Sequence, residues 1–303
     1  EWHDVDFRVL RDAGVEVIKP MSQTRPHHFE RMKRELPNVE IITRLHGGGF
    51  GEGHHPGASQ FADQMIPVMA ALQPYCSKFH VHNEPNHVKL YEGWGPTDED
   101  ALSFNAWFLE AYHRLKEAHP WASIGFPGLA VGDGDHREGA WLRICRPAIE
   151  RADWLGAHCY WQTPPGSPSN LSDPSWGLRF QLHHSLYPDK VIEVLECGNS
   201  NVQRPQNDPW PISDEAIAEE YVQWLQQVFN YPYINSASFF ILSSHDTGNW
   251  SFFSWRTENG AIKPVVHRVR AMHRPQWAPV NSPAPKPKPE PPVTTPAGLT
   301  NQI

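Results

Sequence analysis

Two glutamates stand at the ends of short apolar runs that have the composition of buried strands. Glu84 closes one run and precedes Pro85, and Glu196 closes another shortly before Gly198. A buried strand that ends on a carboxylate, with a turn-forming residue behind it, delivers that acid to a sheet edge where loops begin. Two acids presented in this way can divide the work of cleaving a glycosidic bond. One protonates the leaving oxygen, and the other attacks the sugar or activates water.

Strand-like apolar runs alternate with longer amphipathic runs between residues 4 and 272. This alternation predicts an α/β protein with a parallel sheet covered by helices. A (β/α)8 TIM barrel fits the length, and a doubly wound sheet is the competing arrangement. The expected strands are Val15–Met21, Glu40–His46, Phe79–Asn83, Ser123–Pro127, Trp154–Tyr160, Val191–Glu196 and Ser236–Ser243. The expected helices are Asp4–Ala13, Phe61–Leu72, Asp98–Ala118, Trp141–Arg151, Pro174–Leu186, Asp214–Phe229 and Lys263–Met272.

The expected strands number one fewer than a complete barrel needs, and the helix Asp4–Ala13 precedes the first of them. In a barrel, the first strand then lies upstream of Glu1 or has been lost, which predicts a gap or an exposed edge between strands 8 and 2. In barrel numbering, Glu84 ends strand 4 and Glu196 ends strand 7. Because the carboxyl ends of parallel strands share one face, the two acids should converge although 196 − 84 = 112 residues separate them.

Strand pleating predicts which side chains lie beneath the two acids. Every second side chain of a strand points to the same face. The side chains two and four positions before each glutamate should therefore also face the barrel axis. These side chains are His82, His80, Val194 and Ile192.

The sequence Asn83-Glu84-Pro85 at the end of a fourth strand, with a glutamate ending a seventh, resembles the clan-A retaining glycoside hydrolases. These (β/α)8 enzymes include the cellulase-like family 5 and the xylosidase-like family 39. The resemblance covers roughly residues 10–274. It implies Glu84 as acid/base, Glu196 as nucleophile and Asn83 as donor to the sugar 2-hydroxyl. It also implies an eight-stranded barrel with no metal and no organic cofactor.

The resemblance extends to side chains around the two acids. His158-Cys159-Tyr160 matches the His-x-Tyr at the end of strand 6 in family 5, which implies a tyrosine near the nucleophile. The strand-8 tryptophan of the clan has no exact counterpart. Trp250 or Trp255, in the loop after the last strand, is expected to serve instead.

Further polar and aromatic side chains are expected at the rim. Arg44 and His46 alternate inward on strand 3, and Lys19 is a further candidate on strand 2. Charged groups inside a barrel must be paired or functional. We expect a polar rim that holds the sugar and orients the acids, with a closed structural salt-bridge network as the alternative. Trp161 follows Tyr160 and is expected either to stack on a sugar ring or to anchor a loop.

The two-acid mechanism sets requirements on this site. Glu84 must hold a proton to act as an acid. Glu196 must stay ionised, so donors should surround it, and Tyr160, Arg44 and His158 are the candidates from neighbouring strand ends. Retention of configuration requires carboxyl groups about 5–5.5 Å apart, whereas a separation near 9 Å would indicate inversion.

Composition excludes several other classes of function. The 303 residues carry a formal net charge of −8, which argues against binding a phosphate backbone, and no apolar run is long enough for a membrane span. The 13 tryptophans are a high count, consistent with sugar-binding platforms as well as with core packing. The four cysteines lack metal-ligand spacing, and Cys159 and Cys197 are expected to be buried thiols.

Residues 275–303 are rich in proline and almost free of large apolar side chains. Such a segment cannot bury a core and is expected to be an extended, disordered linker. We therefore expect a catalytic domain over residues 1–274 and a tail over 275–303 that joins it to a possible further module. The expected partner is a carbohydrate, and the expected location is the cell surface or the extracellular space.

Two other functions remain open from the sequence. His80 and His82 on one strand face could belong to a metal-dependent hydrolase built on the same barrel, with His46, His158 and Asp246 as further ligands. That hypothesis leaves Asn83-Glu84-Pro85 unexplained. The second alternative is a non-catalytic carbohydrate-binding barrel that keeps its cleft but has lost turnover.

Overall fold

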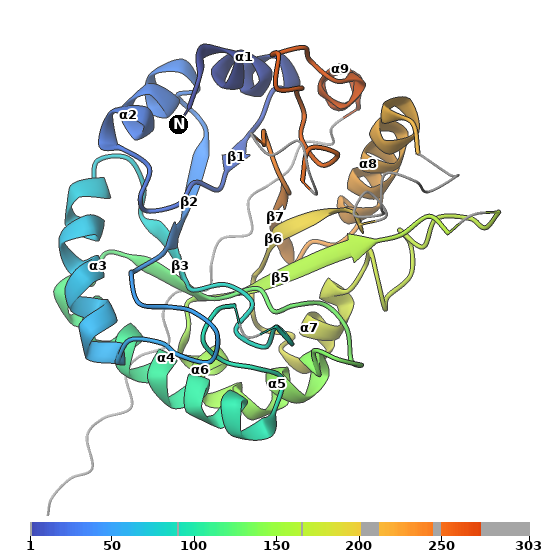
Figure 1. Ribbon diagram of the computed structural model, residues 1–303. Helices are drawn as coiled ribbons and strands as arrows, with labels where there is room; N and C mark the ends of the chain where they lie inside the picture. The colour runs from blue at the N-terminus through green and yellow to red at the C-terminus, as the bar shows by residue number, and fades with distance from the viewer. Residues whose placement is uncertain (1, 90, 165, 201–211, 245–249, 274–303) are drawn as a thin grey trace, which may run out of the picture.

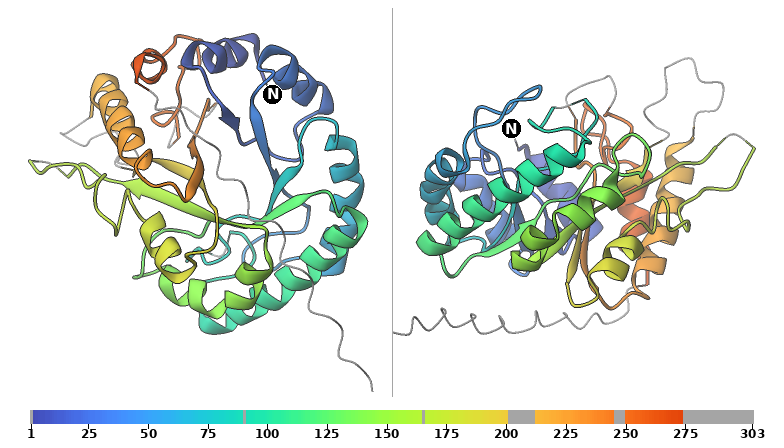
Figure 2. Two further views of the ribbon diagram at one scale, coloured as in Figure 1. Left: turned by 180° about the vertical axis from the view of Figure 1, so that it is seen from behind. Right: turned by 90° about the horizontal axis from the view of Figure 1, so that it is seen from below.

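A computed structural model describes residues 2–89, 91–164, 166–200, 212–244 and 250–273. Seven parallel strands follow one another in sequence order around a barrel, with helices on the outside (Figures 1 and 2). This consecutive order confirms the TIM barrel and excludes the doubly wound sheet. The strands are β1 (Val17–Ile18), β2 (Glu40–Leu45), β3 (Lys78–Val81), β4 (Ser123–Phe126), β5 (Trp154–Trp161), β6 (Ile192–Asn199) and β7 (Ile234–Phe239).

The helices form the outer layer. They are α1 (Asp4–Ala13), α2 (Pro26–Glu35), α3 (Ala58–Leu72), α4 (Asp98–Ala118), α5 (Glu138–Ile144), α6 (Arg146–Arg151), α7 (Phe180–Leu186), α8 (Asp214–Val228) and α9 (Pro264–Ala271). The sequence did not predict α2, because only Phe29 and Met32 of its ten residues are buried and the apolar periodicity is therefore faint.

The barrel is open between β1 and β7, as the strand count predicted. Within the described residues the sheet begins at β1 and ends at β7, which are not paired with each other. A cavity of about 930 Å³ occupies the gap, with helix side chains such as Leu10 and Val269 on its outer wall. It extends from Glu40 and Asn235 near the amino ends of the strands to Lys19, Arg44 and Glu196 near the carboxyl ends.

The side-chain pattern of β3 agrees with the prediction up to the end of the strand and then departs from it. Phe79 and Val81 pack toward the helices, and His80 is fully buried near Trp154. The prediction for His82 is wrong, because its backbone turns into the left-handed region with φ 73°. Its imidazole Nε2 donates to a backbone carbonyl at 2.7 Å. Its ring lies among the aromatic side chains Phe50, Trp94, Phe104 and Trp107.

The side-chain pattern of β6 also differs from strict alternation. The pairing of β6 with β7 shifts register between Val194 and Cys197. An irregularity of this kind changes which face the following side chains occupy. Leu195 therefore packs inside the barrel with Ile42 and Trp154. Ile192 and Val194 instead pack in a hydrophobic cluster with residues of α8 and α9. The prediction that they fill the barrel axis is therefore wrong.

Cys159 and Cys197 are buried free thiols, as predicted. The predicted boundary at residue 274 and the tail 275–303 lie outside the described residues. No helix within the described ranges combines the length and apolarity needed to cross a bilayer.

Candidate active site

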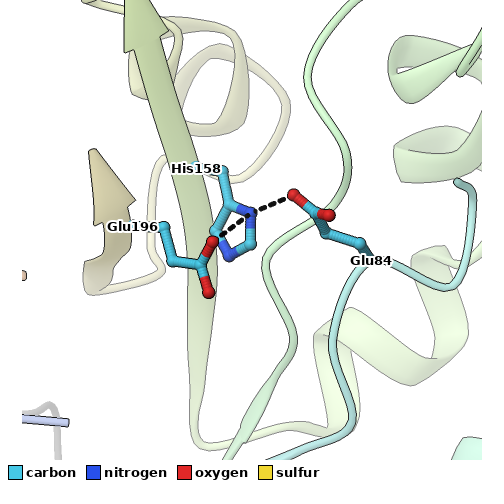
Figure 3. A group of neighbouring side chains, drawn as sticks. All are labelled: Glu84, His158 and Glu196. Atoms are coloured by element: carbon cyan, nitrogen blue, oxygen red, sulfur yellow. Dashed lines mark hydrogen bonds and ion pairs between the residues drawn. The ribbon is translucent and has the colours of Figure 1, made fainter. Parts of the chain in front are cut away.

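Glu84 and Glu196 meet at the rim of the barrel with His158 between them (Figure 3). Nδ1 of His158 lies 2.7 Å from Oε1 of Glu84 and 3.8 Å from Oε2 of Glu196. One carboxylate oxygen from each glutamate and one ring nitrogen of the histidine all lie within 4.8 Å of one another. The predicted convergence of two acids from distant parts of the chain is therefore present in the structure.

Glu84 is carried by a loop that two neighbouring strands support. It lies three residues beyond the end of β3, has a left-handed backbone with φ 41°, and its N–H donates to the carbonyl of Gly128 at 3.0 Å. Asn86 is fully buried and exchanges two hydrogen bonds with the backbone of Ala130, at 2.9 and 2.8 Å. These bonds tie the Glu84 loop to the loop after β4. Sequence reasoning missed Asn86, because its partners lie on another strand's loop.

Glu196 has both carboxylate oxygens engaged by donors. Nζ of Lys19 donates to Oε1 at 2.8 Å, and the hydroxyl of Tyr160 donates to Oε2 at 2.9 Å. Burial alone would raise the pKa of Glu196, but the positive charge of Lys19, the nearby His158 and the two hydrogen bonds hold it well below its usual value. Burial and the two negative carboxylates raise the pKa of Tyr160 well above its usual value, so the phenol remains a donor.

The cation that contacts Glu196 is Lys19 and not Arg44, which the sequence analysis had named as a donor. Arg44 was expected as a donor to Glu196, but its guanidinium pairs with Glu92 at 2.7 Å. Lys19, which follows β1, takes that place instead. The sequence could suggest both cations for the rim, but it could not decide which of them contacts Glu196. That choice depends on side-chain length and on the competing carboxylate of Glu92.

Asn83 and His158 each have a buried polar atom without a partner among the described residues. Asn83 is 6% exposed, and its Oδ1 accepts no hydrogen bond. His158 is fully buried, and its Nε2 is unpartnered. A Cβ atom on Gly128 would lie 2.3 Å from that Nε2, so only glycine leaves room for the ring. The position of the imidazole between the two acids is therefore fixed by packing.

Two of the tryptophans predicted to bind sugar are buried. Trp161 is fully buried, its Nε1 donates to Glu220 at 2.9 Å, and its ring stacks on Trp224. Trp255 is 7% exposed and packs in the core against Phe239. The sugar-stacking alternative for Trp161 is wrong, because its ring is covered by the barrel's own side chains. Trp255 lines the cavity that reaches Glu196, so its contact with a sugar stays a prediction.

Trp250 and His46 lie at the surface and near the rim, respectively. Trp250 is 39% exposed, and its ring is 5.3 Å from that of Phe240, which in turn lies 6.5 Å from the ring of Tyr160. His46 is half-buried beside Phe50, and burial with the charge of Arg44 lowers its pKa. Trp250 therefore remains a candidate for the predicted aromatic contact with a sugar.

The metal hypothesis based on His80 and His82 does not fit the geometry. His82 turns away into the aromatic cluster, and Asp246 lies outside the described residues. In the described part of the chain, one group of three side chains could ligate an ion: Glu84, His158 and Glu196. Within this group, the ammonium of Lys19 already supplies a positive charge 2.8 Å from Glu196. Lys19 therefore already balances part of the negative charge that a metal ion at this group would balance.

No family model and no curated protein matches the sequence. Among solved structures, an endo-β-1,3-glucanase of glycoside hydrolase family 128 from Amycolatopsis mediterranei, crystallised with laminaripentaose, is similar. It has 13% identity and a TM-score of 0.57, over 90% of this chain and 97% of that one. β-Glucuronidase 2 of Bacteroides uniformis is similar over 91% of this chain and 32% of its own, with 15% identity and a TM-score of 0.64.

A family 51 α-L-arabinofuranosidase from Bifidobacterium longum has 12% identity and a TM-score of 0.62, over 89% of this chain and 66% of its own. At such identities the similarity establishes the fold and not the activity. The resemblance drawn from Asn83-Glu84-Pro85 and Glu196 is confirmed at that level. The chain has the TIM-barrel fold of these glycoside hydrolases, with seven strands in its described residues.

Proposed function

We propose that the protein is a retaining glycoside hydrolase with Glu84 as acid/base and Glu196 as nucleophile. The observation that carries this proposal is the distance between the two acids, because an oxygen of each lies within 4.8 Å of the other. Retaining enzymes hold their carboxyl groups about 5–5.5 Å apart, whereas inverting enzymes leave about 6.5–9.5 Å for a water molecule. The distance here falls on the retaining side.

The environments of the two acids support their different roles. Glu196 is held ionised by Lys19 and Tyr160, as a nucleophile requires. The side chain of Glu84 is 21% exposed, about twice the 10% of Glu196, and its Oε1 contacts His158. Two titratable groups in environments this different are suited to opposite tasks in one reaction.

The chemical steps follow from these positions. A carboxylate oxygen of Glu196 attacks the anomeric carbon while Glu84 gives its proton to the leaving oxygen, so the glycosidic bond breaks and a glycosyl ester forms. Glu84 is then a carboxylate, and the Nδ1–H of His158 can donate to it at 2.7 Å. Glu84 next takes a proton from water, the water oxygen attacks the same carbon, and Glu196 leaves as a carboxylate.

Asn83 and Trp250 are proposed to contact the sugar bound at Glu196. The amide of Asn83 directly precedes the acid/base, and its unpartnered Oδ1 is nine-tenths buried, which supports a role in holding a hydroxyl. Trp250 is exposed next to aromatic side chains that lead to Tyr160. We propose β-linked oligo- or polysaccharides as substrates, which would put the protein at the cell surface or outside the cell.

The test is a panel of aryl β-glycosides of glucose, xylose, galactose and glucuronic acid, together with laminarin and other soluble polysaccharides. We expect turnover on at least one substrate, and proton NMR should first detect the product with the configuration of the substrate. Initial release of the opposite anomer would contradict the retaining mechanism. Binding of a polysaccharide without turnover of any substrate would instead favour the non-catalytic carbohydrate-binding barrel.

A further inference from the structure

The loop that begins at Glu84 carries an exposed aromatic surface that the two-acid chemistry does not use. Tyr91 is 54% exposed, and its ring stacks on His87 with centroids 5.2 Å apart and an interplanar angle of 27°. The ring of His87 lies 4.8 Å from that of His136, which comes from the loop after β4. We call Tyr91, His87 and His136 the aromatic platform.

Backbone hydrogen bonds hold the platform in place. The His87 N–H donates to the carbonyl of Glu84 at 3.0 Å. The Lys89 N–H donates to Nδ1 of His87 at 3.1 Å, and the Val88 N–H donates to Nδ1 of His136 at 3.2 Å. Because each Nδ1 accepts a hydrogen bond, both imidazoles are fixed in tautomer and orientation before a ligand arrives. Rings that are already ordered lose little entropy when a ligand stacks on them.

The loop leaves and rejoins the mouth of the barrel. It begins at Glu84, and at its other end Glu92 pairs with Arg44 at 2.7 Å. Burial raises the pKa of Glu92, Arg44 lowers it, and the negative charges of Glu84 and Glu196 raise it further. Arg44 lines the same cavity as Glu196, and the residue immediately before Glu92 is Tyr91. The platform thus stands beside the cleft and not on a remote surface.

The position of Glu84 indicates which part of a bound substrate lies beside the aromatic platform. Glu84 protonates the leaving oxygen, so the leaving group lies on its side of the bond, whereas Glu196 bonds to the other sugar. We propose that the platform stacks against the first sugar of the leaving group, which makes the substrate a chain of sugars and not a glycoside with a small aglycone. Nζ of Lys89, 5.8 Å from the Tyr91 ring centroid, supplies a donor for sugar hydroxyls. This inference rests on the proposed function.

The test compares two substrates of whichever sugar the panel selects. The first is its glycosyl fluoride, whose leaving group is a single atom and cannot reach the platform. The second is its linear tetrasaccharide. In Tyr91→Ala, we expect kcat/KM on the tetrasaccharide to fall about tenfold, which corresponds to about 1.4 kcal/mol. The value on the fluoride should be unchanged. Tyr91→Trp, which keeps a flat ring, should retain most activity on both substrates.

The matched control is Leu102→Ala, because Leu102 is a 60% exposed apolar side chain on α4, outside the platform and the acid pair. It should leave both substrates unaffected. An unchanged tetrasaccharide rate in Tyr91→Ala, or an equal loss on both substrates, would overturn the platform and leave the two-glutamate chemistry standing. Failure of the wild-type protein to turn over either substrate would instead overturn the proposed function.

Discussion

Strand β6 carries two buried glutamates, each paired with a lysine, at opposite ends of the barrel. At the amino-terminal end, Glu193 is fully buried and contacts Lys78, Ser236 and Asn235. At the carboxyl-terminal end, Glu196 contacts Lys19 and Tyr160, but its side chain keeps 10% exposure and an oxygen within 4.8 Å of a second carboxylate.

The two lysines are almost equally exposed, at 13% for Lys78 and 14% for Lys19. What differs is therefore the surroundings of the carboxylate and not the pairing itself. A second acid stands beside each pair, because Lys78 also bridges to Glu40 at 3.1 Å, whereas His158 lies between Glu196 and Glu84. Glu193 is fully buried in a closed pair, where Lys78 offsets the cost of burying its charge. Glu196 keeps some exposure in an open pair, which is suited to chemistry. In TIM barrels in general, residues at the carboxyl-terminal face serve catalysis, and those at the amino-terminal face serve stability.

The largest expected difference between the two ends is in turnover. Glu196→Gln removes the proposed nucleophile, so we expect kcat to fall by at least about 10⁴-fold while the protein stays folded. Glu193→Gln is the matched control on the same strand, and its activity should stay within about threefold of wild type, because it lies far from the cleft. Steady-state kinetics with circular dichroism measures both. Equal losses in the two variants would remove the distinction between the ends.

The next effect is on stability and concerns the closed pair. Lys78→Met leaves the fully buried Glu193 without its cation, and breaking a buried pair in this way costs about 3–5 kcal/mol. Urea denaturation should show this loss in the free energy of unfolding, with little change in kcat for the folded protein. A neutral effect on stability would mean that Asn235 and Ser236 alone satisfy the carboxylate.

Lys19→Met tests the open pair by the pH dependence of activity. Without the ammonium, burial dominates and the pKa of Glu196 rises, so the acid limb of kcat/KM should move up by about 1–3 pH units. Lys19→Arg retains the charge and should restore most of the acid limb. An acid limb that stays in place in Lys19→Met would show that Lys19 does not control the ionisation of Glu196.

The smallest effect is an opposite pH dependence of stability at the two ends. The pKa of Glu196 is lowered in the folded protein, so its stabilisation is present above the usual value of 4.5 and is lost as pH falls below it. Burial raises the pKa of Glu193, so stability is lost there as pH rises from 4.5. Unfolding free energies of Glu196→Gln and Glu193→Gln, measured against wild type from pH 3 to 8, should therefore diverge in opposite directions.

Much of the site could be predicted because strand ends in a parallel barrel share one face. That rule alone brings Glu84, Glu196, His158 and Tyr160 together from three separate strands. It needs only the type and order of the elements, which alternation of apolar and amphipathic runs reveals. The same count of elements predicted the gap between β1 and β7.

The failed predictions share a physical cause. The orientation of His82 follows from its left-handed backbone, and that of Leu195 follows from a register shift. Strict alternation of side chains predicts neither. The position of Trp161 depends on which face of its strand meets α8, and tryptophan fits a core as well as a cleft. Asn86 was missed because its partners come from a different strand's loop.

The most direct test of the central claim is to trap the covalent intermediate on the nucleophile. A 2-deoxy-2-fluoro aryl glycoside of the sugar on which the protein is active should inactivate it with release of the phenol. Intact-protein mass spectrometry should then detect one added glycosyl group, and peptide sequencing should place it on Glu196. A label on any other residue, in protein that was active before treatment, would contradict the assignment of Glu84 and Glu196.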